Sequence, residues 1–223
     1  MNVRTKPPRP YRSSLRDAQS QQTRERILLA AKEFLETGDL ADLTLRRLAE
    51  LAEVSAPTVY AHFPTLDELY RAFFVWLKPH IGTDLALPAF ADFASMPAQF
   101  FPRFARQGRL LRNLMDTPAW DRLRAADWKA KQENWAGPIR SALPDLTTIE
   151  ADRAAIALAA FSTPSVWRWL VDIAGCSESE AEQIASWATA ALADALARNA
   201  SALGDAADPT PPKPTSRKKG TPA

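Results

Sequence analysis

The 223-residue sequence contains few of the residues on which most catalytic and metal sites depend. It has one cysteine and two histidines, so it can form neither an intrachain disulfide nor a His/Cys cluster with metal-ligand spacing. Its seven glycines are scattered, and no glycine-rich phosphate loop or dinucleotide fingerprint is present. These shortages argue against a metal site, a bound cofactor and an enzyme.

Long apolar runs and strand patterns are scarce as well. No apolar run approaches the ~20 residues needed to span a bilayer, and the N-terminus is polar, basic and proline-containing. Sustained alternation of β-branched and polar residues is missing, whereas apolar residues recur at helical spacing throughout. The apolar share of 46% and the charged share of 24% are typical of an ordinary globular protein. We therefore expect an all-α cytoplasmic protein with no membrane partner.

Two short amphipathic helices joined by a tight turn are predicted between Leu43 and Phe63. Thr44 is a good N-cap for the first helix, whose apolar positions share one face. Ser55 is the N-cap of the second, and Pro57 follows in the first helical turn, where its missing N–H costs nothing. This spacing is typical of a DNA-reading helix-turn-helix.

The second helix of this pair is expected to have a buried side and an outward side. Val59 and Phe63, four residues apart, point inward. The outward side combines small residues with one tyrosine and one histidine, a composition that suits a DNA groove: Ala56, Pro57, Thr58, Tyr60 and His62. We predict that the first three of these lie near base edges, and that Tyr60, His62 and the cap Thr44 contact phosphates.

These residues and their flanks resemble the DNA-binding domain of the TetR (tetracycline-repressor) family of bacterial transcriptional regulators. Residues 23–38 are similar to the first helix of that family, and residues 63–69 to the entry into its fourth helix. Three positions depart from the family pattern. Glu53 replaces the usual turn glycine, so we expect a left-handed or strained turn that costs about 1 kcal/mol. Leu66 replaces a common lysine and Ala61 a larger, often polar residue, which removes family contacts with DNA.

The resemblance implies an N-terminal three-helix helix-turn-helix domain followed by a C-terminal helical domain for ligand binding and dimerisation. We divide the chain into a flexible basic arm, a DNA-binding domain, an effector-binding and dimerisation domain and a disordered basic tail: residues 1–19, 20–78, 79–203 and 204–223. Eight to ten helices are expected.

Capping residues and prolines predict where the later helices begin and end. Capping boxes are predicted at Thr65 with Glu68, Thr147 with Glu150, and Ser177 with Glu180. Prolines are expected to stop one helix at Pro79, to end another near Pro138 and to kink a third at Pro164. The expected helices after the DNA-binding domain cover about 66–78, 96–116, 118–137, 148–174 and 178–199.

Positive charge is concentrated away from the helix-turn-helix. Residues 20–65 carry five basic and seven acidic side chains, whereas residues 1–19 carry five basic and one acidic. We expect the arm to supply much of the nonspecific attraction to DNA; the alternative is a solvated extension without a role. The full set of expected DNA contacts is Arg12, Arg16, Thr44, Arg46, Ser55, Ala56, Pro57, Thr58, Tyr60 and His62.

The last predicted helix carries an apolar stripe that fits a helix–helix interface. Its alanines permit close approach, and the resemblance implies that the two C-terminal helices pair with their twofold mates as a four-helix bundle. The alternative is a core helix within one chain. The expected interface consists of Ile184, Trp187, Ala188, Ala191, Leu192 and Ala195, with Leu196 on the same stripe.

The region between the two ends is rich in aromatic rings, which mostly form core. The resemblance implies an effector pocket here for an apolar or aromatic small molecule. The candidate pocket residues are Phe100, Phe104, Trp120, Trp128, Trp135, Phe161 and Trp167. Arginines at 103, 106, 109 and 112 recur three apart, as on a solvated helix face; the alternative is that one neutralises a ligand carboxylate.

The function expected is that of a sequence-specific DNA-binding transcriptional regulator. It would be a homodimeric repressor of the bacterial cytoplasm that binds a palindromic operator in double-stranded DNA, lies on the nucleoid when bound, and is released by its effector. The near-neutral helix-turn-helix and Leu66 leave open a helical interaction module without DNA affinity. An enzyme is the remaining alternative, opposed by the scarcity of histidine and cysteine.

Overall fold

The computed structural model describes residues 11–82, 89–199 and 203, and this part of the chain is helical without any strand. It contains 3-10 turns at Leu40–Asp42 and Phe90–Ser95 and a π-helical turn at Trp169–Ile173. The α-helices are α1 (Tyr11–Thr37), α2 (Leu45–Leu51), α3 (Ala56–His62), α4 (Leu66–Ile81), α5 (Met96–Arg106), α6 (Gly108–Met115), α7 (Trp120–Ala142), α8 (Thr148–Ala160), α9 (Pro164–Arg168) and α10 (Glu178–Arg198). The all-α fold and the expected number of helices are confirmed for the described residues.

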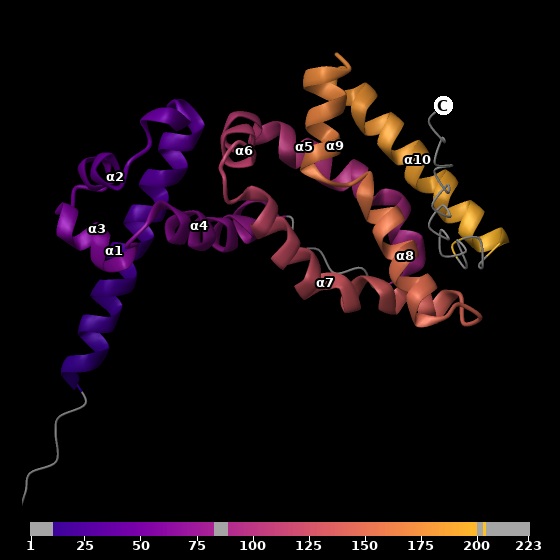
Figure 1. Cartoon of the computed structure of the whole chain (residues 1–223), viewed down its shortest axis with the longest axis horizontal. Helices are drawn as coiled ribbons and strands as arrows, with labels where there is room; N and C mark the ends of the chain where they lie inside the picture. Colours follow the sequence, from indigo (N-terminus) through magenta and orange to yellow (C-terminus); the bar gives the residue numbers. More distant parts are fainter. Residues whose placement is uncertain (1–10, 83–88, 200–202, 204–223) are drawn as a thin grey trace, which may run out of the picture.

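The helices form an elongated molecule with a different group of helices at each end. Figure 1 shows α1, α2 and α3 at one end and α8 and α10 at the other, with α4, α6 and α7 between them. Two hydrophobic clusters follow this division. One contains the apolar residues of α1 to α4, and the other contains mainly those of α5 and α7 to α10. The first also contains Leu110, Leu114 and Trp120, so packing continues across the boundary expected after residue 78.

The arm predicted over residues 1–19 is partly helical. Helix α1 begins at Tyr11 and is the longest helix in the described part of the chain, so the prediction was wrong for residues 11–19. The physical reason is that this segment has no proline or glycine after Pro10. The second half of α1 is packed, and a helix extends easily from a packed turn towards its N-terminus. Residues 1–10 and the tail at 204–223 lie outside the described residues, so their predicted flexibility is untested.

Two prolines expected to stop helices lie inside them instead. Pro79 is in the last turn of α4, which continues to Ile81 and is capped by Gly82. Gly82 has a left-handed backbone (φ 64°), and its N–H donates to the carbonyls of Lys78 and Pro79. Pro138 lies inside α7, which continues to Ala142. A proline removes one hydrogen bond and crowds the preceding turn, a disturbance that packing tolerates close to a helix end.

Two predicted long helices are divided. The helix expected over 96–116 forms α5 and α6, separated at Gln107. The helix expected over 148–174 is interrupted, not merely kinked, because α9 starts anew with Pro164 in its first turn. Thr163 caps this new helix by accepting a hydrogen bond from the Val166 N–H at 3.3 Å.

Of the three predicted capping boxes, those at Thr147 and Ser177 are reciprocal. Thr65 accepts from the Glu68 N–H at 3.2 Å and starts α4 as a simple N-cap.

The stretch Thr148–Ile173 is apolar and long enough to cross a membrane by composition alone, with a mean hydropathy of 1.2. No apolar stretch of this length was expected from the sequence. In the described structure 44% of its most apolar window is buried, and its helix is interrupted before Pro164. Ala151, Ala154 and Ala155 are completely buried in the second hydrophobic cluster. Its apolar composition is thus accounted for by packing in the core.

Candidate DNA-reading surface and effector cavity

The α2–turn–α3 unit is stabilised at both helix starts and at the turn. Thr44 Oγ1 accepts from the Arg47 N–H at 3.0 Å, and Ser55 Oγ accepts from the Thr58 N–H at 3.2 Å, as predicted. Glu53 has a φ of 51°, which confirms the left-handed turn expected there. Arg26 of α1 donates to the Ala52 carbonyl at 2.6 Å, so the first helix holds this turn in place.

Helix α3 presents one side to solvent and buries the other. Val59 and Phe63 are buried to 0% and 1% exposure, as predicted, and they anchor the helix in the first hydrophobic cluster. Pro57 and Tyr60 are exposed. Figure 1 shows α3 at the outer edge of its end of the molecule.

The other DNA-contact candidates differ in their exposure. Thr44, Arg46, Ser55 and Arg16 are exposed, whereas Ala56, Thr58 and His62 are half-buried. The Thr58 hydroxyl lies 2.7 Å from Ser55 Oγ and is therefore already engaged at the cap. Arg12 lies on α1, but its side chain is outside the described ones. Which of these residues touch DNA stays a prediction.

The two other departures from the family pattern have different environments. Leu66 is half-buried and packs against the first hydrophobic cluster, so the position commonly held by lysine serves the core in this chain. Ala61 is exposed and leaves that part of the α3 surface small.

A cavity of about 80 Å³ lies where α4 to α9 meet. Because one water needs roughly 10–15 Å³ of cavity volume, several waters or a small ring system would fit. Five of the seven predicted pocket aromatics line it: Phe100, Phe104, Trp120, Trp128 and Trp135. Phe161 and Trp167 do not. Trp167 is a core residue with 0% exposure, and its Nε1 donates to Glu178 at 2.6 Å.

One face of α7 supplies three of the four charged residues of the described lining. Arg124, Asp127 and Lys131 alternate with the tryptophans at helical spacing on this face. The Asp127 carboxylate, only 8% exposed, receives Lys78 Nζ at 2.6 Å, Arg124 at 3.5 Å and Lys131 at 3.9 Å. Burial lowers the pKa of Arg124, and the charge of Asp127 opposes that shift.

The four regularly spaced arginines were expected on a solvated helix face, with ligand binding as the alternative, and none of them lines this cavity. Arg112 pairs with Asp172, and its Nε donates to a carboxylate oxygen at 2.7 Å. Arg109 donates to the carbonyl of Gly38 at 3.1 Å. Arg124 was not among the residues predicted to line a pocket. The signal that would have found it is its place four residues after Trp120 and before Trp128, on one helix face.

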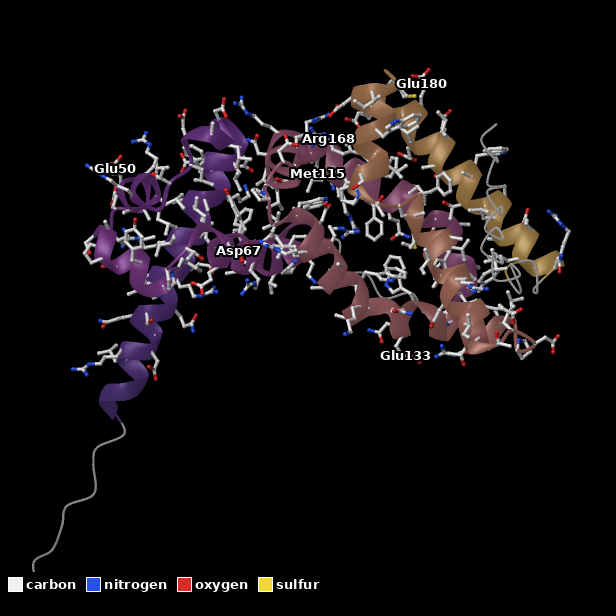
Figure 2. The ribbon with its side chains drawn as sticks, in the orientation of Figure 1. Glu50, Asp67, Met115, Glu133, Arg168 and Glu180 are labelled. Atoms are coloured by element: carbon white, nitrogen blue, oxygen red, sulfur yellow. The ribbon has the colours of Figure 1, made fainter. Side chains whose placement is uncertain are left out.

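The cavity wall is connected directly to the DNA-binding end. Phe74 of α4 packs edge-on against Trp120 of α7, with ring centroids 6.0 Å apart, and both residues line the cavity. Asp67, near the start of α4, pairs with Arg122 of α7, and Figure 2 labels Asp67 at the middle of the molecule. Helix α4 therefore belongs both to the helix-turn-helix end and to the cavity.

At the opposite end, α10 exposes the apolar stripe proposed for dimerisation. Trp187 and Ile184 are 73% and 43% exposed, and the stripe continues through Ala191 and Ala195. Ala188 and Leu192 are half-buried beside it. Leu196 faces the other way, with 4% exposure, so its assignment to the same stripe was wrong. Neighbouring α8 adds the exposed Ile149 and Ile156.

Comparisons with known proteins agree with these features. Residues 27–73 match the family model described as "Bacterial regulatory proteins, tetR family". No curated protein sequence matches the chain. A solved TetR transcriptional regulator from Rhodococcus sp. RHA1 is similar at 19% identity and a TM-score of 0.53, over 77% of this chain and 96% of that one.

Two further solved structures share the fold. A tetR-family regulator from Streptomyces coelicolor is 16% identical, with a TM-score of 0.54, over 81% of this chain and 84% of that one. NalD, described as the secondary repressor of the MexAB-OprM multidrug efflux pump in Pseudomonas aeruginosa, is 18% identical, with a TM-score of 0.52, over 78% and 95%. The matched segment and the shared fold are those of DNA-binding transcriptional regulators. The resemblance to the TetR family, a family of regulators and not of enzymes, is confirmed.

Proposed function

We propose that the protein is a homodimeric repressor that binds a palindromic operator and is released by a small apolar or aromatic effector. The observation that carries this proposal is the α2–turn–α3 unit, with both caps formed, Val59 and Phe63 buried, and the opposite side of α3 exposed. A helix held in this way enters the major groove with its N-terminal residues towards the bases. The operator lies on the bacterial nucleoid, in the cytoplasm.

The exposed stripe of α10 supports a dimer. Contiguous apolar surface on a protein of this size marks an interaction site, and a C2 interface uses the same patch on both subunits. A helix-turn-helix subunit also needs a twofold partner to read both halves of a palindrome. The stripe on α10 with Ile149 and Ile156 of α8 would form that interface.

The position of the cavity supports release by an effector. Its wall includes Phe74 and Lys78 of α4, the helix that follows the helix-turn-helix directly. A ligand that favours a different placement of α4 weakens DNA binding, and by linkage DNA weakens the ligand to the same extent. A coupling of about 1–3 kcal/mol gives a five- to 150-fold switch.

The test is to select bound sequences from random DNA with the purified protein. We expect inverted half-sites about one helical turn apart or a multiple of it. Thr58→Ala should alter the preference at one position in each half-site, whereas Tyr60→Phe should weaken all sites alike. Lys129→Met, an exposed change on α7, is the control and should do neither. Failure to enrich any sequence would favour an interaction module without DNA affinity.

A further inference from the structure

Arg124 is a charged group with few partners on the wall of an aromatic cavity. Among the described residues its guanidinium makes one hydrogen bond, a long one of 3.5 Å to Asp127, and it lies 5.7 Å from the centre of the Trp120 ring. Arginine has five N–H donors. Only 34% of its side chain is accessible, and it lines the cavity, so part of its donor capacity is directed at this space. Surrounding protein atoms lower the pKa of Arg124 by desolvation.

Ser162 supplies a second, independent observation. It lies between α8 and α9, is only 5% exposed and lines the same cavity. Its Oγ is buried without a hydrogen-bond partner in the described structure. Buried polar groups without partners are rare in folded proteins and call for an explanation. A ligand oxygen in the cavity would provide the missing partner.

The charges around the cavity select the sign of the ligand. The described charged residues of the lining are Lys78, Arg124 and Lys131, all basic, and Asp127, the one carboxylate among them. A cationic ligand would meet three groups of its own sign, whereas an anion would find a guanidinium that can bind carboxylate oxygens through two parallel N–H groups.

We propose that the cavity binds a small aromatic carboxylic acid as its anion, with the carboxylate on Arg124 and the ring among Trp120, Trp128 and Phe104. The remaining lining is apolar and aromatic, which matches a planar ring, and the volume of about 80 Å³ limits its size. This inference rests on the proposed function, because it names the chemical class of the effector. The bound acid competes with Asp127 for Arg124. Because Asp127 also pairs with Lys78, this competition takes place next to a contact with α4.

The experiment compares matched ligands that differ only in charge. Benzoate, benzamide and benzylamine form one set; naphthoate, naphthamide and naphthylmethylamine form a larger one. Each is titrated into the full-length protein by calorimetry. The better-fitting acid should bind about tenfold or more tightly than its amide, as expected for a charge-assisted hydrogen bond, and the amine should bind weakest.

Substitutions then assign the preference to Arg124. Arg124→Met keeps an apolar stem and should abolish the preference for the acid while amide affinity stays within about twofold. Lys129→Met, which removes a cation from an exposed position of the same helix, should leave the preference intact. Arg124→Gln is the second variant, and circular dichroism checks that both Arg124 variants keep the helicity of the unmodified protein.

The outcomes separate this inference from the proposed function. Equal binding of acid and amide, binding of neither acid, or a preference that survives in both Arg124 variants would overturn the inference. Selected operator DNA is added as a final component. Arg124-dependent binding of the acid without loss of operator affinity would keep the ligand class and refute its role as effector. Release of DNA by the neutral amide, with no release by the acid, would keep the proposed effector response and refute the ligand class.

Discussion

The α2–turn–α3 unit and the candidate effector cavity are built in different ways. The first depends on contacts between close neighbours in the sequence, such as Thr44 with the N–H of Arg47 three residues later. The second depends on contacts between distant segments: Lys78 meets Asp127 across 49 residues. Local chemistry therefore decides where α2 and α3 begin and how the chain turns between them, whereas the cavity exists only when several helices have packed.

The two regions also differ in what occupies their polar groups. In the α2–α3 unit the cap hydroxyls and the turn carbonyls are hydrogen-bonded within the chain. At the cavity, Ser162 Oγ has no partner in the described part of the chain, and Arg124 has one long contact there. The unsatisfied polar groups at the cavity are the observation on which the proposed ligand site rests, because buried polar groups normally have hydrogen-bond partners.

The largest predicted effect tests whether substitutions on α10, far from α3, lower the affinity for DNA. Trp187→Arg or Ala191→Arg places an unpaired charge in the proposed α10 interface, and dimerisation should weaken about a hundredfold or more. Operator affinity should fall with it, while helicity is kept. Sedimentation equilibrium and DNA-shift titration measure the two. Ala197→Arg, exposed on the same helix outside the stripe, is the matched control, and intact dimers for both interface variants would place the interface elsewhere.

The next effect tests the local character of the DNA-reading unit. Glu53→Gly removes the strain of the left-handed turn and should raise the free energy of unfolding by about 1 kcal/mol. Glu50→Gly, three residues earlier in α2, should lower it by about the same amount, because glycine is a poor helix former. Urea unfolding compares the two variants. Destabilisation by Glu53→Gly would mean that the turn glycine of the family is not needed here.

A smaller effect concerns a long-range ion pair outside the cavity lining, between α6 and the π-helical turn. Arg112 donates to Asp172 at 2.7 Å, and this bond lowers the pKa of Asp172 below its usual value. A carboxyl group with a lowered folded-state pKa adds stability above its ordinary pKa and loses it as the pH falls through the folded value.

Asp172→Asn should therefore reduce stability at neutral pH by up to about 1 kcal/mol and flatten the loss of stability on acidification. Part of the acid sensitivity should remain, because bonds at the two capping boxes lower the pKa of Glu150 and of Glu180. Urea unfolding between neutral and acidic pH measures this, and an unchanged acid limb would remove Asp172 as a source.

The smallest effect tests the wall of the cavity. Ser162→Ala deletes a buried hydroxyl that has no hydrogen bond to lose, so stability should change by less than about 0.5 kcal/mol or rise. Ser177→Ala is the same substitution at a satisfied N-cap and should cost about 1 kcal/mol. Thermal and urea unfolding compare the pair. Equal losses would show that Ser162 is hydrogen-bonded in solution.

Much of the fold was predictable where the signal lay within a few residues. The caps at Thr44 and Ser55, the left-handed Glu53 and the burial of Val59 and Phe63 all follow from short-range stereochemistry. Predictions based on proline were less successful, because the effect of a proline depends on its distance from the helix end and on packing. Pro79 and Pro138 lie within helices, whereas Pro164 starts one.

The candidate cavity was only partly predictable. Aromatic density led to five residues that do line it, but also to Trp167, which the core buries completely. The regular arginines of the 103–112 segment attracted attention, although the guanidinium at the cavity belongs to Arg124 of α7. Spacing identifies residues that share a helix face, but it does not say which faces meet.

By itself, the sequence determined the all-α character, the helix-turn-helix with its caps and turn, and the resemblance to the TetR family, because backbone propensities and capping act over three or four residues. The tertiary structure decided that α7 turns Arg124 and three tryptophans towards the cavity, that Ser162 is enclosed without a partner in the described structure, and that α10 leaves Trp187 in solvent. These depend on how whole helices pack against one another, through contacts between residues that lie tens of positions apart in the chain.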